Sequence, residues 1–271
     1  MKTLRFQQLG LIMLLLWGYT GLLTGCEQNP SPKKPPETPT PKSNESKVQA
    51  IGPTPTPYQI DLSEVPLPTS ETLQRDTLGL FFCLDISGSM GGWIGNKKKI
   101  DISKEAMRKV FTQIASYVQS HPEKKVEVGL CSFDHRVNLL QPLETFDQDK
   151  LERMIQPLQP SGNTAIGDAI LLAFKEILKS GVETKAILVM TDGENNRGIS
   201  PELAVDAIKQ DRNNRQVLTA DVDVFLIAFD VNASVFEGVK KAGAIVVESR
   251  DQKSLEGVLS SIVEQVLLEA K

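Results

Sequence analysis

Few side chains in this sequence are suited to covalent catalysis. The 271 residues include three cysteines and two histidines, His121 and His135. Serine hydrolases hold their nucleophile between closely spaced glycines, and neither Ser87 nor Ser89 has that pattern. We expect His121 at a helix end and His135 in a turn on the opposite side of the fold. The glycines near the two serines also lack the spacing and the lysine of a phosphate-binding loop. We therefore expect that the protein is not an enzyme.

An excess of basic charge is also missing. The formal net charge is -4, and removal of residues 1–25, which carry two basic and no acidic side chains, changes it to -4 - 2 = -6. A negatively charged domain repels the phosphates of nucleic acids, so we expect no nucleic-acid partner. The longest basic run, Lys97–Lys99, is interpreted as a solvated loop before a helix.

The apolar run near the N-terminus is too short for a membrane-spanning helix. It extends from Leu9 to Leu23, about 15 residues, whereas roughly 20 are needed to span a bilayer. It ends in Leu23-Thr24-Gly25-Cys26, which resembles a bacterial lipoprotein signal. The resemblance implies a signal peptide over residues 1–25 and lipidation of Cys26. The protein would then be lipid-anchored to the cell membrane or outer membrane and face the extracytoplasmic side; a membrane-spanning anchor is the alternative.

The composition changes twice after this signal. Residues 26–57 contain mostly Pro, Thr, Ser, Lys and Glu, which cannot form a core, so we expect a lipidated cysteine followed by a Pro-rich disordered tether. Residues 58–77 mix apolar and turn residues and are interpreted as a lead-in segment. Residues 78–271 are long enough to bury a substantial core and are predicted to form one domain.

Short apolar runs alternate with helical patterns along this domain. Such alternation predicts an α/β fold with a doubly wound, mainly parallel sheet and helices on both faces. The predicted strands are Leu80–Leu84, Val126–Cys131, Ala186–Met190, Val222–Ala228 and Ala244–Val247. The predicted helices are Ile100–Val118, Ala165–Leu178, Pro201–Arg212, Ser234–Lys241 and Ser254–Leu268.

One further strand is predicted to run antiparallel. Arg136–Leu140 follows the strand at Val126 after the short link Phe133–His135. A link of this length is too short for a crossover helix, so the two strands should form a hairpin at the edge of the sheet.

Oxygen donors follow two of the predicted strands and precede one helix. Asp85, Ser87 and Ser89 come after the first apolar run, Asp192 follows Ala186–Met190, and Thr164 precedes the helix at Ala165. Ligands of doubly wound sheets bind beyond the carboxyl ends of the strands, where these side chains would meet. The three segments resemble the metal-ion-dependent adhesion site of the von Willebrand factor A family, written Asp-x-Ser-x-Ser, then Thr, then Asp.

This resemblance implies a fold, a metal and a kind of partner. The family fold is a doubly wound sheet with one antiparallel edge strand. In the family, the two serines and usually the threonine bind the ion directly, and the acids act mostly through water. The resemblance implies that Ser87, Ser89 and Thr164 bind the ion directly here, and that Asp85 and Asp192 act mostly through water. Such an oxygen-rich site suits Mg²⁺, with Mn²⁺ or Ca²⁺ as alternatives. The remaining ligand would be an acidic residue of a protein or peptide partner.

The same residues have structural interpretations. Ser87 and Ser89 could hydrogen-bond their own turn, Thr164 could cap the helix that follows it, and Asp192-Gly193 is a common turn pair. An enzymatic alternative starts from Asp85, because haloacid-dehalogenase-type phosphatases also begin with an Asp at a strand end and bind Mg²⁺. Their second acid would be needed where Ser87 stands, and it is missing.

Neighbouring residues carry weaker hypotheses. Trp93 is a candidate anchor for a partner, and packing under the metal loop is its alternative. Asp168 and Glu194 are interpreted as helix-stabilising or surface charges. Cys83 and Cys131 lie in strands expected to be neighbours, and we expect free buried thiols because adjacent buried strands seldom offer disulfide geometry.

Overall fold

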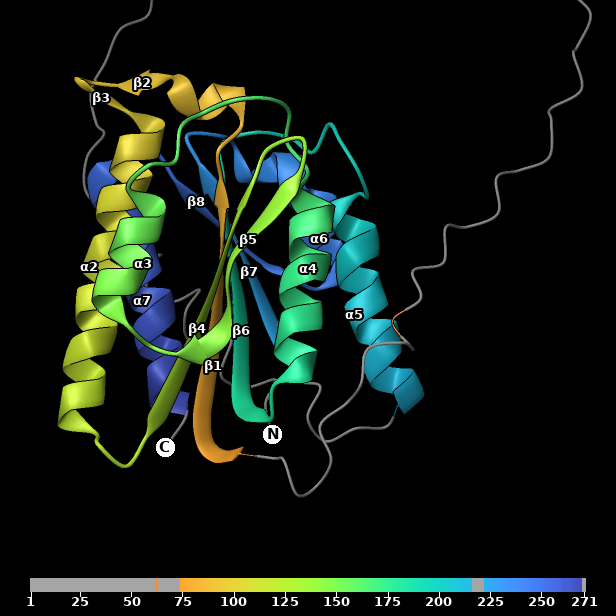
Figure 1. The fold of residues 1–271 in the computed structure, drawn as a ribbon. Coiled ribbons are helices and arrows are strands. Elements are labelled where there is room, and N and C mark those ends of the chain that lie inside the picture. Colours follow the sequence, from red (N-terminus) through yellow and green to blue (C-terminus); the bar gives the residue numbers. More distant parts are fainter. Residues whose placement is uncertain (1–61, 63–73, 216–221, 270–271) are drawn as a thin grey trace, which may run out of the picture. The chain divides into compact units, whose positions relative to one another are not determined.

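A six-stranded, mainly parallel sheet organises the domain (Figure 1). The computed structural model describes residues 62, 74–215 and 222–269. The strand order is β5-β4-β1-β6-β7-β8, and every neighbouring pair is parallel except β4 and β5. The strands are β1 (Gln74–Asp85), β4 (Lys125–Phe133), β5 (Val137–Thr145), β6 (Val182–Thr191), β7 (Val222–Phe229) and β8 (Ile245–Ser249). The predicted fold class and the antiparallel edge hairpin are therefore confirmed.

Helices cover both faces of the sheet, with α2, α3 and α7 on one face and α4, α5 and α6 on the other (Figure 1). They are α2 (Lys99–Ser120), α3 (Gln148–Ile155), α4 (Ile166–Lys179), α5 (Pro201–Arg215), α6 (Glu237–Ala242) and α7 (Gln252–Glu269). Two 3-10 helices, η2 (Gly88–Gly91) and η3 (Ala233–Phe236), follow β1 and β7. A small hairpin of β2 (Trp93–Ile94) and β3 (Lys97–Lys98) leads into α2.

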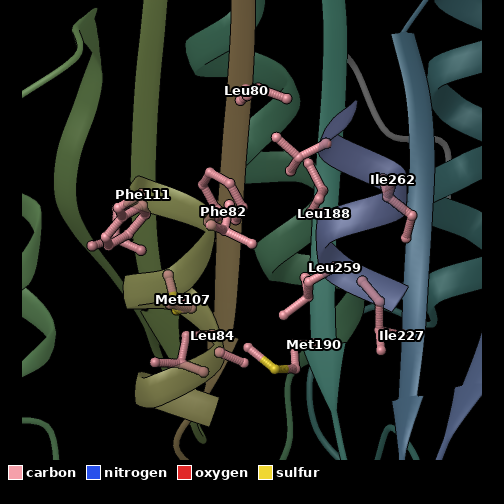
Figure 2. Close-up of a cluster of buried hydrophobic side chains, with 14 of the residues drawn as sticks. Leu80, Phe82, Leu84, Met107, Phe111, Leu188, Met190, Ile227, Leu259 and Ile262 are labelled. Carbon is pink, nitrogen blue, oxygen red and sulfur yellow. The ribbon is translucent and has the colours of Figure 1, made fainter. Parts of the chain in front are cut away.

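The core consists of two apolar layers because β1 is buried on both faces. Leu80, Phe82 and Leu84 point into the layer under α2 and α7, while Phe81 and Cys83 point into the layer under α4. This two-sided burial explains why the strand is apolar at every position rather than at alternate ones. Figure 2 shows the first layer, in which Phe82 lies beside Phe111 of α2. Their rings meet edge to face, with centroids 5.8 Å apart.

Several elements differ from the sequence prediction. β5 extends to Thr145 rather than Leu140, β6 begins at Val182 rather than Ala186, and the β2–β3 hairpin was not predicted. β1 begins at Gln74, earlier than the predicted Leu80, and its pairing with β6 is irregular between Gln74 and Leu78. The helix α3 was not predicted. It buries only Leu151 and Ile155, and the Asp147 side chain caps it by accepting the backbone N–H of Lys150. Two apolar residues one turn apart are too weak a periodic signal to identify a helix.

The cysteines in the strands are free and buried. Cys83 of β1 lies directly opposite Cys131 of β4 in the parallel register. Burial, together with the neighbouring Cys131, raises the pKa of the Cys83 thiol well above its ordinary value. Both residues therefore act as small apolar side chains of the core, as expected.

The predictions for the N-terminal part of the chain lie mostly outside the described residues. The signal over residues 1–25, Cys26 and the tether up to residue 57 all belong to that part. Leu62, from the lead-in segment, is buried in the layer under α4. Within residues 74–215 and 222–269, no helix combines the length and the apolar character needed to cross a membrane.

We expect Gly129→Ala to destabilise the domain by roughly 1–3 kcal/mol through overpacking. Gly129 lies opposite Phe81, and a Cβ added there would be 2.2 Å from the Phe81 ring, which is fully buried. Gly257→Ala is the matched control. Its new methyl group meets no atom within 4 Å on the exposed side of α7, so it should stabilise by roughly 0.5–1 kcal/mol. Urea denaturation of both variants measures the difference, and equal effects would contradict the described packing.

Candidate metal centre

Three segments that are distant in sequence meet at the carboxyl edge of the sheet. Asp85 ends β1, and Asp192 directly follows β6, the parallel neighbour of β1. The loop before α4 is joined to the segment after β1 by two backbone hydrogen bonds. The N–H of Ser161 donates to Ile86 O at 2.7 Å, and the N–H of Gly88 donates to Gly162 O at 3.0 Å. The meeting of the three segments is what the sequence predicted.

The serine hydroxyls form a short chain that ends on a carboxylate. Ser87 Oγ and Ser89 Oγ are 3.0 Å apart, and the Ser89 hydroxyl donates to Asp192 Oδ1 at 2.6 Å. The local turn uses the backbone of Ser87 instead, because its N–H donates to Asp85 Oδ1 at 2.6 Å. The Ser89 hydroxyl therefore links the turn after β1 to the end of β6, whereas the Ser87 hydroxyl stays within its own turn.

Asp85 is the most constrained side chain of the centre. It is fully buried, Oδ1 accepts the Ser87 N–H, and Oδ2 accepts the Thr191 hydroxyl at 2.6 Å. Burial raises the pKa of the Asp85 carboxyl to about 6, although the hydrogen bonds from Thr191 and Ser87 act to lower it; the nearby charge of Asp192 adds to the rise. Thr191 is part of the centre, and the sequence interpretation missed it.

Thr164 is placed by its backbone. Its N–H donates to Asn196 Oδ1 at 2.8 Å, and its carbonyl accepts the N–H groups of Asn196 and Arg197 at 3.1 and 3.2 Å. The loop after β6 thus holds the loop before α4. Because Thr164 is itself buried, this clasp determines where its side chain can lie.

Thr164 is not the cap of α4. The N-cap is Ala165, and it makes no side-chain cap bond. Asn195 takes that role from the other loop, since its Oδ1 accepts the N–H of Ile166 at 2.7 Å. Its amide also donates to Ile199 O at 3.2 Å. The Asn-Asn pair after Asp192-Gly193 was the available signal, but its partner loop is about 30 residues away in sequence and cannot be found by local pattern.

The nearby acids have structural positions. Asp168 lies in the first turn of α4, and its Oδ1 accepts the N–H of Ile199 at 3.1 Å, so it also ties the loop after β6 to α4. Glu194 is exposed. Neither joins the hydroxyl chain through a described hydrogen bond.

Lys99 contradicts the interpretation of Lys97–Lys99 as a solvated loop. Its Nζ lies 3.0 Å from Asp192 Oδ2 and 2.7 Å from Asp230 Oδ2, and its side chain is only 13% exposed. Burial acts to lower the pKa of this ammonium group, but the hydrogen bonds to Asp230 and Asp192 outweigh burial and raise the pKa. The sequence also did not identify Asp230, which follows β7.

Trp93 is exposed beside this centre. The residue is 64% exposed on the hairpin that follows η2, and the Lys98 Nζ lies 5.9 Å from the centre of its ring. The alternative that Trp93 packs under the loop is therefore wrong.

His135 lies at the same edge as the serines, not on the opposite side. β4 runs parallel to β1, so the turn after it reaches the carboxyl edge. A Cβ on Gly162 would lie 2.6 Å from His135 Nδ1, and that nitrogen is 3.1 Å from Asp134 Oδ1. Asp134 in turn accepts the Ser161 hydroxyl at 3.1 Å, so this turn supports the loop before α4.

The donor set fits a hard cation. It consists of hydroxyls and carboxylates, which suit Mg²⁺, Mn²⁺ or Ca²⁺ rather than thiolate-binding metals. Across the described ranges, no three His, Cys, Asp or Glu side chains gather into a metal-binding group. A cation here would therefore depend on serine and threonine hydroxyls. Burial is the largest cause of the raised pKa of Asp85, and the nearby charge of Asp192 makes the smallest contribution.

In the presence of a chelator, we expect the free energy of unfolding of the wild-type protein to fall as the pH rises, because of the Asp85 carboxyl. The folded-state pKa of about 6 lies above the unfolded value of about 3.9, so the folded state retains the proton longer and its stability falls as the pH rises between these values. The loss reaches roughly 2–3 kcal/mol above pH 6, because each pKa unit corresponds to about 1.4 kcal/mol. Asp85→Asn removes the titration. Denaturation of both proteins at pH 4 and pH 7 checks this: a stability difference that does not change with pH would refute the assignment.

Comparison with known proteins agrees with this architecture. Residues 80–194 match the model of the von Willebrand factor type A domain. The chain is similar to protein NorD of Brucella abortus (strain 2308), with 25% identity over 169 residues that make up 60% of this chain and 26% of NorD. The chain thus spans about a quarter of the length of this curated relative.

Two solved structures have a similar fold. The conserved hypothetical protein BatB from Bacteroides thetaiotaomicron aligns with a TM-score of 0.55 and 19% identity over 70% of this chain and 98% of BatB. The PilB minor pilin from Streptococcus sanguinis aligns with a TM-score of 0.55 and 16% identity over 75% of this chain and 64% of the pilin. At these identities the likeness extends to the fold alone. The segment that matches the von Willebrand factor type A domain, residues 80–194, contains all five predicted ligands, Asp85, Ser87, Ser89, Thr164 and Asp192.

Proposed function

We propose that this protein is a binding module that engages an acidic group of a protein or peptide through a divalent cation. Mg²⁺ is the proposed ion, and Mn²⁺ and Ca²⁺ are alternatives. The observation that carries the proposal is the hydroxyl chain from Ser87 through Ser89 to Asp192, beside the buried Asp85. The match of residues 80–194 to the von Willebrand factor type A domain supports it.

The hydroxyls and the carboxylates of the centre would have different roles in binding the ion. Ser87, Ser89 and Thr164 would hold the ion through neutral oxygens, and Asp85 and Asp192 would supply the negative charge around it. A cation bound mainly by neutral oxygens keeps enough positive charge to attract one more anionic oxygen from a partner. The Asn195 and Asn196 side chains, which hold the loop before α4, would keep Thr164 in place during binding.

The phosphatase-like alternative is less well supported by the geometry. A nucleophilic Asp85 would need a carboxylate oxygen free to face a substrate. Both of its oxygens instead accept hydrogen bonds, from the Ser87 N–H and the Thr191 hydroxyl, and the residue is buried. Hydrolysis of a phosphate ester by the wild-type protein that is lost in Asp85→Asn would favour the enzyme instead.

We also propose that the domain is held at a membrane on the extracytoplasmic side. The support is the sequence Leu23-Thr24-Gly25-Cys26 after an apolar run, which resembles a lipoprotein signal, and the Pro-rich stretch that follows it. Mass spectrometry of the membrane-extracted protein tests this: a mature chain that begins at a diacylated Cys26 is expected, and Cys26→Ser should release the protein from the membrane fraction.

Mg²⁺ should raise the thermal midpoint of the purified protein, because a ligand that binds only the folded state stabilises it. At a concentration 100-fold above the dissociation constant the gain is about 2.7 kcal/mol. Ser89→Ala and Asp85→Ala should lose most of this response. Ser116→Ala, which changes an exposed serine of α2, should respond like the wild type.

Differential scanning fluorimetry with and without chelator measures the response. A wild-type midpoint that does not change with Mg²⁺, Mn²⁺ or Ca²⁺ would eliminate the proposed function. A normal response in Asp85→Ala would mean that the ion binds elsewhere.

Trp93→Ala should weaken partner binding without changing the fold or the Mg²⁺ response. The side chain is largely exposed, so its removal should change stability by less than about 0.5 kcal/mol, whereas a Trp anchor in an interface is commonly worth 2 kcal/mol or more. Leu268→Ala is the matched control, because Leu268 is exposed at the end of α7. Immobilised wild-type and variant proteins can be compared for Mg²⁺-dependent retention of the partner. Equal retention by wild type and Trp93→Ala would remove Trp93 from the interface.

A further inference from the structure

We propose that Lys99 is a built-in counter-cation of this centre: its ammonium group neutralises Asp192 when no divalent cation is bound and is retained by Asp230 when one is. This inference rests on the proposed function. Lys99 would compete with the divalent cation for the Asp192 carboxylate and would therefore lower the affinity of the centre for the ion.

Three aspartates at the ends of three neighbouring strands create the need for such a charge. Asp85 ends β1, Asp192 follows β6 and Asp230 follows β7, and these strands are adjacent in the sheet. Their formal charge of -3 is reduced to -2 by Lys99, which equals in magnitude the charge of one divalent cation. Without Lys99, the metal-free centre would hold one more uncompensated negative charge.

The backbone directs Lys99 to this position. Lys99 is the first residue of α2, and its N–H donates to Gly92 O at 2.8 Å, which fixes the start of the helix against the loop after η2. The side chain passes close to Gly92, where an added Cβ would lie 3.5 Å from Lys99 Cε. The ammonium group therefore reaches the aspartates from a defined direction along a short, largely buried path.

The two carboxylates that hold the ammonium group differ in exposure. The Asp192 side chain is 0% exposed and the Asp230 side chain is 42% exposed. A buried carboxylate that loses its partner is costly, whereas a half-exposed one is solvated by water. Asp192 therefore depends on a nearby cation, either Lys99 or a divalent ion. Asp230 can hold the lysine alone.

The backbone of Asp230 places its carboxylate beside Lys99. Its backbone is in the left-handed region, with φ 55°, which Asp tolerates better than most residues. Its N–H donates to Ser249 O at 2.7 Å on the neighbouring strand β8. This conformation lets the carboxylate reach Lys99 at 2.7 Å.

The adjacent lysines have other partners and provide controls. Lys97 pairs with Glu105 at 2.7 Å, and Lys98 lies over the ring of Trp93. Lys98→Met removes the same charge one residue away from Lys99, but not from the aspartates. A difference between these two variants therefore reports the position of the charge and not the net charge of the protein.

The first experiment compares the two variants as full-length proteins. In the presence of a chelator, Lys99→Met should lower the thermal midpoint by roughly 3 °C or more, because the buried Asp192 loses its cationic partner. Lys98→Met should change the midpoint little. In Mg²⁺ titrations followed by calorimetry, Lys99→Met should bind the ion roughly tenfold more tightly than wild type, because a competing unit charge has been removed from beside the ion. Lys98→Met should stay within roughly threefold of wild type, as expected for a screened surface charge.

The second experiment tests the role of Asp230 by a double-mutant cycle. Asp230→Asn should weaken Mg²⁺ binding more in the wild-type background than in Lys99→Met, because in the wild type it also leaves the lysine with Asp192 as its only carboxylate partner. Equal effects in the two backgrounds would mean that Asp230 acts only as a nearby negative charge, which would overturn its part in the proposal.

The outcomes separate this inference from the proposed function. If the wild type does not bind Mg²⁺, both fail. If the wild type binds Mg²⁺, Asp85→Ala does not, and Lys99→Met behaves like Lys98→Met in chelator and in the titration, only the inference about Lys99 fails. Lower stability in chelator combined with tighter Mg²⁺ binding in Lys99→Met supports it, since a merely structural lysine would not produce both effects.

Discussion

Two buried carboxylates at the ends of neighbouring strands are the constraint on which the candidate centre depends. Asp85 and Asp192 leave neighbouring parallel strands at the same edge of the sheet, and burial removes the water that would separate their charges. The surrounding side chains stabilise the two carboxylates in two ways. Ser89 and Thr191 donate hydrogen bonds to the carboxylates, and Lys99 brings positive charge. The proposed divalent cation would bring a second source of positive charge.

The fold supplies the rigidity that such a centre needs. β1 is packed on both faces, so the backbone at Asp85 cannot move without disturbing two core layers. The loops that carry Thr164 and Asp192 are less deeply packed, and they hold each other through the side chains of Asn195 and Asn196. The centre therefore combines a fixed strand end with a clasp of two loops, which holds the segments that carry the neutral oxygen donors together.

Much of this could be predicted from sequence because its physical signals are local. A strand buried on both faces is apolar at every position, and an acid that directly follows it must lie at the strand end. Asp85 and Asp192 are placed by this reasoning alone, and hydrogen bonds join their segments to the loop that carries Thr164. The short helix α3 lacked such a signal. His135 was misplaced although the predicted parallel strand at Val126 already ends at the same edge of the sheet as Asp85.

The sequence by itself determined the alternation of strands and helices, the antiparallel edge hairpin and the set of oxygen-bearing residues at the strand ends, because each follows from spacing within about ten residues. The tertiary structure decided which side chains support that set. Lys99 appears in the sequence as one of three equivalent lysines, and Asp230 as an ordinary acid after a strand. Only the order of β1, β6 and β7 brings the two together beside Asp192, since contacts between distant segments depend on how the sheet is assembled.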